Sequence, residues 1–117
     1  MIITIKATNI ELTAAIRNYV EEKISSLDKY LNHFDPESVL VKVEVGKTTQ
    51  HHQKGLVFRA EANLTVPRNF FRAEDETTDL YASIDAVHDE LKRQIVTLKE
   101  KAVKEKVRRA RKNKEKI

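Results

Sequence analysis

The sequence predicts an α+β fold in which two helices pack on one face of a four-stranded sheet. Every strand-like segment has one apolar face, and both helix-like segments carry a single apolar stripe. Strands with one apolar face need cover on that side only, and helices with single stripes supply it. The element order is β-α-β-β-β-α, and 117 residues suit one domain rather than two.

The first third of the chain predicts a strand and a long helix. Residues 2–7 alternate, and their apolar face consists of Ile3, Ile5 and Ala7. Apolar residues then recur at three- and four-residue spacing from Leu12 to Asn32. This spacing predicts an amphipathic helix of about five turns, with Thr13 as a candidate N-cap.

Three strands are predicted in the middle of the chain. Valine alternates with other residues over 39–45, and apolar residues alternate again over 56–66. A polar loop bounded by two glycines joins these strands over 46–55. A turn at 67–69 leads to a shorter fourth strand that contains Phe71.

The last predicted element is a long helix that begins around Thr77 or Thr78. Its apolar stripe follows the helical period through Leu80, Ile84, Val87, Leu91, Ile95, Leu98 and Ala102. Beyond Val103 the stripe fades into charged residues. We therefore expect a domain over residues 1–103 and a basic C-terminal tail over 104–117, either a frayed helix or disordered.

The charge is divided unevenly along the chain. Residues 92–117 carry twelve Lys or Arg against three Glu, whereas residues 1–91 carry ten Lys or Arg against fifteen Asp or Glu. A densely basic end on a mildly acidic body favours a polyanionic partner, nucleic acid first and anionic membrane second. The alternative is a tail that only aids solubility.

Composition excludes several classes of protein. The chain has no cysteine, so it has no disulfide and no thiolate metal site. No apolar run approaches the roughly 18 residues of a membrane span, and the N-terminus lacks a signal pattern. We expect a cytoplasmic protein without a cofactor, a small-molecule substrate or a membrane partner.

No catalytic constellation emerges. His51 and His52 stand together in the polar loop, without acidic or cysteine neighbours at a ligand-like spacing, so a chance pair is favoured over a metal site. The only glycines, Gly46 and Gly55, form no phosphate loop. Acidic residues before the last helix suit its macrodipole. The sequence does not predict an enzyme.

The basic residues are more informative. Lys92, Lys99 and Lys106 are seven residues apart and share one helix face, with Arg93 beside them. If the two helices lie side by side, their lysines and arginines combine into one positive strip for a phosphate backbone. The alternative is a solvated face of i,i+4 ion pairs, such as Glu100 with Lys104 and Glu105 with Arg109, which neutralise only part of the charge.

Several stretches resemble a known family. Asn9-Ile10-Glu11-Leu12-Thr13, Ala15-Ile16-Arg17-Asn18-Tyr19-Val20 and Val41-Lys42-Val43-Glu44 resemble ribosome hibernation factors, the family of hibernation-promoting factor and ribosome-associated inhibitor. The most specific stretch is Asp79-Leu80-Tyr81-Ala82-Ser83-Ile84-Asp85, followed by Leu91-Lys92-Arg93-Gln94. The resemblance covers residues 1–102 and is to the short type of the family, without a second domain.

The resemblance implies a fold akin to double-stranded-RNA-binding domains and a ribosomal function. The chain would bind the small ribosomal subunit and its rRNA as a monomer, occlude the messenger and transfer RNA sites, and silence translation on idle ribosomes. Charge-assisted contacts with phosphates would come from basic residues of both helices. The resemblance implies this role for Arg17, Lys23, Lys29, Arg93 and Lys101, and the shared helix face adds Lys92 and Lys99 as candidate RNA-binding residues.

The chain departs from the family pattern at three positions. Ser26, Glu90 and Thr97 stand where relatives often carry lysine. We expect Lys92, Lys99 and the basic tail to compensate. Two other functions are kept open: a generic double-stranded-RNA-binding module, and an interaction protein whose basic helix pairs with an acidic partner.

Overall fold

The computed structural model describes residues 1–49 and 55–115 and confirms the predicted fold class. Its helices and strands follow the predicted order, with two short 3-10 segments added. The elements are β1 (Ile2–Thr8), α1 (Ala14–Ser25), η1 (Ser26–Tyr30), η2 (Pro36–Ser38), β2 (Leu40–Thr49), β3 (Leu56–Val66), β4 (Asn69–Thr77) and α2 (Leu80–Glu115).

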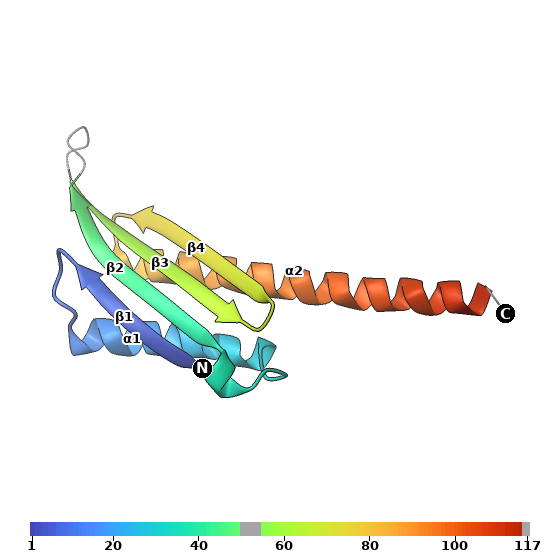
Figure 1. Ribbon diagram of the computed structural model, residues 1–117. Coiled ribbons are helices and arrows are strands. Elements are labelled where there is room, and N and C mark those ends of the chain that lie inside the picture. Colours follow the sequence, from blue (N-terminus) through green and yellow to red (C-terminus); the bar gives the residue numbers. More distant parts are fainter. Residues whose placement is uncertain (50–54, 116–117) are drawn as a thin grey trace.

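The sheet has the strand order β1-β2-β3-β4. β1 runs parallel to β2, and the other two pairs are antiparallel. Parallel neighbours need a crossover connection, and α1 with the two 3-10 segments provides it. In Figure 1, α1 lies behind β1 and β2 while α2 lies behind β3 and β4, so both helices cover one face of the sheet.

The strand register places the apolar residues of the four strands opposite one another on the face that packs into the core. Ile5, Val43, Ala62 and Ala73 are successive partners across all four strands. The residues in β3 and β4 are alanines, whose small side chains allow close packing of α2 on the sheet. Leu91 of α2 is fully buried there. The predicted inner face of β1, comprising Ile3, Ile5 and Ala7, packs half-buried against this core.

The first helix begins as predicted but changes type before it ends. The Thr13 hydroxyl accepts a hydrogen bond from the backbone N–H of Ile16 at 3.2 Å, which confirms the N-cap. The α-helix ends at Ser25, and the chain continues as a 3-10 helix to Tyr30, so the expected α-helix to Asn32 is wrong in its last part. Apolar spacing alone does not separate the two helix types, because both bring every third residue to one side.

The second strand is longer than predicted. β2 continues to Thr49, with Lys47 opposite Phe58 in β3, so the expected loop over 46–55 is too long. Gly46 lies inside the strand, where an added Cβ would stand 3.0 Å from the carbonyl oxygen of Thr8. This glycine permits the close approach of β1 rather than opening a loop. His51 and His52 lie outside the described residues.

The second helix begins slightly later than predicted and runs further. Thr77 is the last residue of β4, and α2 begins at Leu80 after Asp79, whose carboxylate accepts from the backbone N–H of Tyr81 at 3.1 Å. The structure continues this helix without interruption to Glu115. Figure 1 shows its C-terminal part projecting beyond the sheet, and the longest dimension of the molecule is 67 Å.

The structure therefore forms a helix over most of the segment for which we expected a frayed or disordered tail. The division into a domain over 1–103 and a tail over 104–117 stays a prediction. Among the helices that the structure describes, none is long and apolar enough to cross a membrane.

Candidate nucleic-acid interface

A contact between side chains of α1 and α2 holds the two helices side by side. The Tyr19 hydroxyl donates to the carboxylate of Asp85 at 2.5 Å, and the Lys23 ammonium lies 3.3 Å from the same carboxylate. The rings of Tyr19 and Tyr81 meet edge to face at 4.8 Å. Tyr81 and Asp85 belong to the motif that carried the family resemblance, and here they join the helices.

The chemistry of this contact keeps the tyrosine neutral and the aspartate ionised. The hydrogen bond to the Asp85 carboxylate raises the pKa of Tyr19 to about 12. The same hydrogen bond, with smaller help from Lys23, lowers the pKa of Asp85. Lys23, a predicted RNA-binding residue, is therefore engaged within the protein, although its side chain is still 38% exposed.

A second contact between the helical segments involves Ser26 of η1. Its hydroxyl donates to the backbone carbonyl of Lys23 at 2.6 Å and lies 3.0 Å from Nε2 of His88. The Nδ1 atom of His88 is 2.9 Å from the Asp89 carboxylate. The residue at position 26 thus contributes to helix packing in this chain.

Three predicted lysines gather at one end of the contact between the helices. The ammonium of Lys29 lies 5.2 Å from the ring centroid of Tyr30, and that of Lys92 lies 5.8 Å from the same centroid. Lys99 follows Lys92 by seven residues, on the same flank of α2, and also lies beside Tyr30. The structure brings this group together from η1 and α2. We name Lys29, Lys92 and Lys99 the lysine cluster.

Two other predicted residues lie away from the lysine cluster. Arg93 forms a bidentate ion pair with Glu90, with distances of 2.6 and 2.9 Å. Gln94 bonds both Glu90 and the backbone carbonyl of Arg72 in β4, which places this flank of α2 beside the sheet edge. Lys101 follows Gln94 by seven residues and lies on that same flank.

Glu90 pairs with two neighbouring side chains of α2. The two hydrogen bonds from Arg93 and the one from Gln94 lower the pKa of Glu90 to about 2, so it stays ionised at neutral pH. The single positive strip expected from the sequence is thus divided between two flanks of α2. Arg17 is exposed near the beginning of α1.

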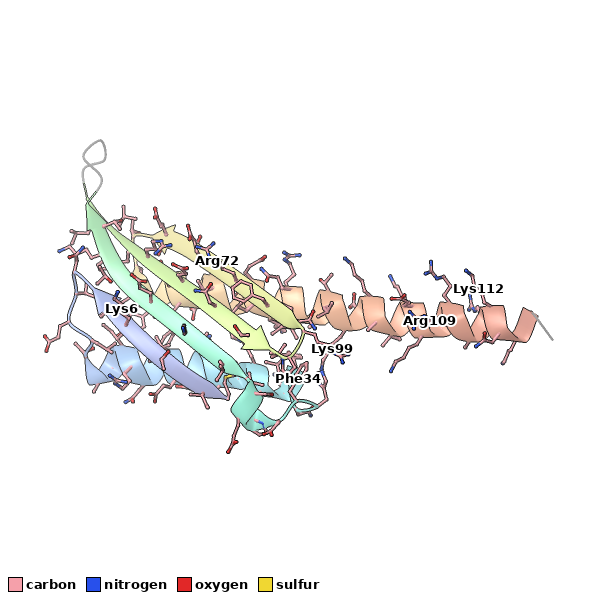
Figure 2. All side chains as sticks on the ribbon, viewed as in Figure 1. Lys6, Phe34, Arg72, Lys99, Arg109 and Lys112 are labelled. Atoms are coloured by element: carbon pink, nitrogen blue, oxygen red, sulfur yellow. The ribbon has the colours of Figure 1, made fainter. Side chains whose placement is uncertain are left out.

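The projecting part of α2 carries the remaining basic residues. Figure 2 shows Arg109 and Lys112 on this part, and Lys99 where the helix leaves the sheet. Of the two ion pairs considered from the sequence, the pair between Arg109 and Glu105 forms at 3.1 Å. No ion pair between Glu100 and Lys104 is present among the residues that the structure places.

The open face of the sheet carries an ion-pair network that the sequence did not predict. Arg59 contacts Glu61 and Glu74 at 2.8 and 2.7 Å, and Arg72 contacts the same two carboxylates at 3.1 and 2.8 Å. The two guanidinium groups lower the pKa of Glu74. Figure 2 shows Arg72 on the side of the sheet away from the helices. Alternating Arg and Glu in adjacent strands was the signal that would have revealed the network.

The charges within this network balance, because two arginines meet two glutamates. The lysine cluster and the projecting part of α2 carry further positive charge that a polyanion can contact. Within residues 1–49 and 55–115, no three His, Asp or Glu side chains are grouped to hold a metal ion.

Comparison with known proteins places the chain in a family. The model of the family described as Sigma 54 modulation protein / S30EA ribosomal protein matches residues 3–103. Ribosome hibernation promotion factor from Lactococcus lactis subsp. cremoris is 43% identical over 91 residues, covering 78% of this chain and 45% of that protein. The protein of the same name from Deinococcus radiodurans is 35% identical over 97 residues, covering 83% of this chain and 48% of that protein.

The chain thus spans about half the length of the curated relatives it matches. Among solved structures, the N-terminal domain of Thermus thermophilus Protein Y is 34% identical, with a TM-score of 0.66 over 81% of this chain and 96% of that chain. A ribosomal subunit interface protein from Coxiella burnetii shares the fold at 20% identity, with a TM-score of 0.62 over 85% of this chain and 98% of that chain. The chain therefore belongs to the Sigma 54 modulation protein / S30EA ribosomal protein family.

Proposed function

We propose that this chain binds the small ribosomal subunit through rRNA phosphates and silences translation on idle ribosomes by occluding the messenger and transfer RNA sites. The observation that carries the proposal is the lysine cluster, in which η1 and α2 bring Lys29, Lys92 and Lys99 around Tyr30. Within the described parts of the chain, these three ammonium groups form no ion pair. Phosphate oxygens are the partners such groups prefer on folded RNA.

The names of the relatives support a ribosomal role. Three curated relatives are called ribosome hibernation promotion factor, and one structural neighbour is called a ribosomal subunit interface protein. In the proposed complex, residues 1–103 form the binding domain and the basic segment 104–117 adds long-range attraction. The secondary contacts in this proposal are Arg17, Lys23, Arg93 and Lys101. Two of them, Lys23 and Arg93, already pair with carboxylates of the protein.

Cosedimentation tests the proposal directly. Purified protein is centrifuged with small subunits, large subunits and a random RNA duplex, and a translation assay is run with the same preparations. We expect retention on the small subunit and loss of translation. Equal retention on the random duplex would instead favour a generic double-stranded-RNA-binding module.

A matched pair of variants tests the lysine cluster. Lys92→Ala with Lys99→Ala removes two charges on the helical side, and Lys6→Ala with Lys42→Ala removes two exposed charges from β1 and β2. Only the first pair should weaken small-subunit binding, with little change in the melting temperature. Equal weakening by both pairs would show that net charge alone governs binding.

Salt dependence separates phosphate binding from an apolar interaction. Contact with six to ten phosphates lowers affinity by about 10³–10⁵ between 50 and 200 mM salt on the DNA-derived scale. Replacing Lys92 and Lys99 should make the dependence shallower, by about 0.7–0.9 in the logarithmic slope per lost contact. A flat response of the unaltered protein would contradict the proposal.

A further inference from the structure

We propose that the groove between η1 and α2 holds one unstacked RNA base, beyond the contacts with phosphates. The groove has a volume of about 470 Å³ and is lined by Tyr30, Val96, Lys99, Glu100, Val103 and Lys104. The inference rests on the proposed function and deepens it, because it assigns a particular nucleotide contact to a particular place on the chain.

The floor of the groove is apolar although it lies at the surface. Val96 and Val103 are seven residues apart and share one flank of α2. Val103 is 61% exposed in a stretch of helix whose other residues are mostly charged. The half-buried ring of Tyr30 lies against the core and faces this flank. A flat apolar partner would bury surface that the protein itself leaves in water.

The rim of the groove is cationic. Lys29 and Lys92 reach over the Tyr30 ring, and Lys99 and Lys104 line the groove on the helix side. None of the four forms an ion pair with a residue that the structure describes. Glu100 is the one acidic residue of the lining. The groove thus joins four positive charges and one negative charge to an apolar floor.

A nucleotide satisfies both parts of this arrangement at once. Every base has a π-face that stacks on an aromatic ring, and the phosphates on either side of it are anionic. When a base approaches Tyr30, the Lys29 and Lys92 ammonium groups exchange the ring for phosphate oxygens, which are stronger partners. Bases inside a duplex have no free face, so the ligand is a loop, a bulge or a single strand.

The experiment measures binding of a short single-stranded RNA of about six nucleotides with one 2-aminopurine, whose fluorescence falls on stacking. A matched RNA has an abasic site at that position. For the unaltered protein we expect about tenfold weaker binding of the abasic RNA, and fluorescence quenching with the intact one. Tyr30→Ala should bind both RNAs equally and without quenching, whereas Tyr30→Phe should behave as the unaltered protein.

Two further variants keep the test decisive. Phe70→Ala removes an aromatic ring that is 59% exposed on the open sheet face, and it should change nothing. Because Tyr30 packs against the core, Val103→Asn supplies a second probe that alters the groove at an exposed position. It should reduce both the quenching and the discrimination against the abasic RNA.

Each outcome has a separate meaning. If Tyr30→Ala and Val103→Asn keep the discrimination and quenching, the base-binding groove is wrong while small-subunit binding through phosphates stands. If the unaltered protein does not cosediment with small subunits, the proposed function itself fails. If a peptide of Phe and Glu residues displaces the RNA and binds more tightly, the groove belongs to an acidic protein partner and the proposal is overturned.

Discussion

The two halves of α2 form one continuous helix, but different interactions stabilise each half. From Leu80 to Leu98 the helix presents Leu80, Ile84, Val87, Leu91 and Ile95 to the sheet, and all five are buried. From Lys101 to Lys114 every residue is exposed. The first half is helical because burial of one face stabilises it, whereas the second has only local backbone hydrogen bonds and side-chain pairs.

Regular secondary structure and tertiary stability are therefore separate properties in α2. The packed half stabilises the domain by burying its apolar face against the sheet. The projecting half places positive charge at a distance from the domain. Because the projecting half buries nothing, substitutions there should affect binding without affecting folding. Variants of the packed half should therefore lower stability far more than variants of the projecting half.

The largest effect is expected for Leu91→Ala in the packed half. Leu91 is fully buried, and truncation of such a leucine costs about 2–5 kcal/mol of unfolding free energy. Val103→Ala is the matched truncation in the projecting half, where the side chain is 61% exposed, and should change stability by less than about 0.5 kcal/mol. Urea unfolding of both variants measures the loss of unfolding free energy in each. An equal loss for Val103→Ala and Leu91→Ala would contradict the proposed difference between the two halves.

Tyr19→Phe should have an intermediate effect and a defined pH dependence. Loss of the hydrogen bond to Asp85 should lower the free energy of unfolding by about 1 kcal/mol near neutral pH. The pKa of Tyr19 is raised to about 12, so its contribution is present below about pH 10 and is lost as the pH rises towards 12. The pKa of Asp85 is lowered, so its contribution is present above about pH 4 and is lost on further acidification.

Denaturant unfolding across this range should therefore show a plateau in the difference between the two proteins, with a decline at both ends. Tyr81→Phe is the matched control, because the Tyr81 ring contacts Tyr19 and its hydroxyl forms no hydrogen bond with any residue that the structure describes. If the difference in unfolding free energy stays constant between about pH 3 and pH 11, the Tyr19–Asp85 hydrogen bond is not its source.

Glu105→Gln should have a small effect confined to the projecting half. The ion pair of Glu105 with Arg109 is exposed, and such i,i+4 pairs contribute about 0.3–0.5 kcal/mol to a helix. We expect a slight loss of helical circular dichroism and an unchanged urea midpoint. A clear fall in the midpoint would mean that the projecting half is coupled to the domain.

Removal of residues 104–117 should have the smallest effect on stability. The free energy of unfolding should stay within about 0.5 kcal/mol, because the described part of this segment is exposed. Small-subunit binding should weaken, and its salt dependence should become shallower, if the basic segment contacts rRNA phosphates. Unchanged affinity would remove that role from the segment.

Local patterns in the sequence determined most of the fold. Period-two alternation fixed which side of each strand faces the core, and the stripe from Leu80 to Ile95 fixed the buried side of α2. The N-cap at Thr13 was also readable, because capping depends on residues within one turn. The length of β2 could not be predicted from the sequence, because Gly46 is explained only by its closeness to Thr8 in another strand.

The candidate site was determined by the sequence in composition and by the tertiary structure in arrangement. Sequence alone named the lysines and arginines, but not the flank of α2 on which each lies relative to α1 and β4. That depends on contacts between distant residues, such as Tyr19 with Asp85 and Gln94 with the carbonyl of Arg72. The periodicity of the sequence determines the angle of each side chain around the helix axis. Only tertiary packing determines which neighbouring element lies at that angle.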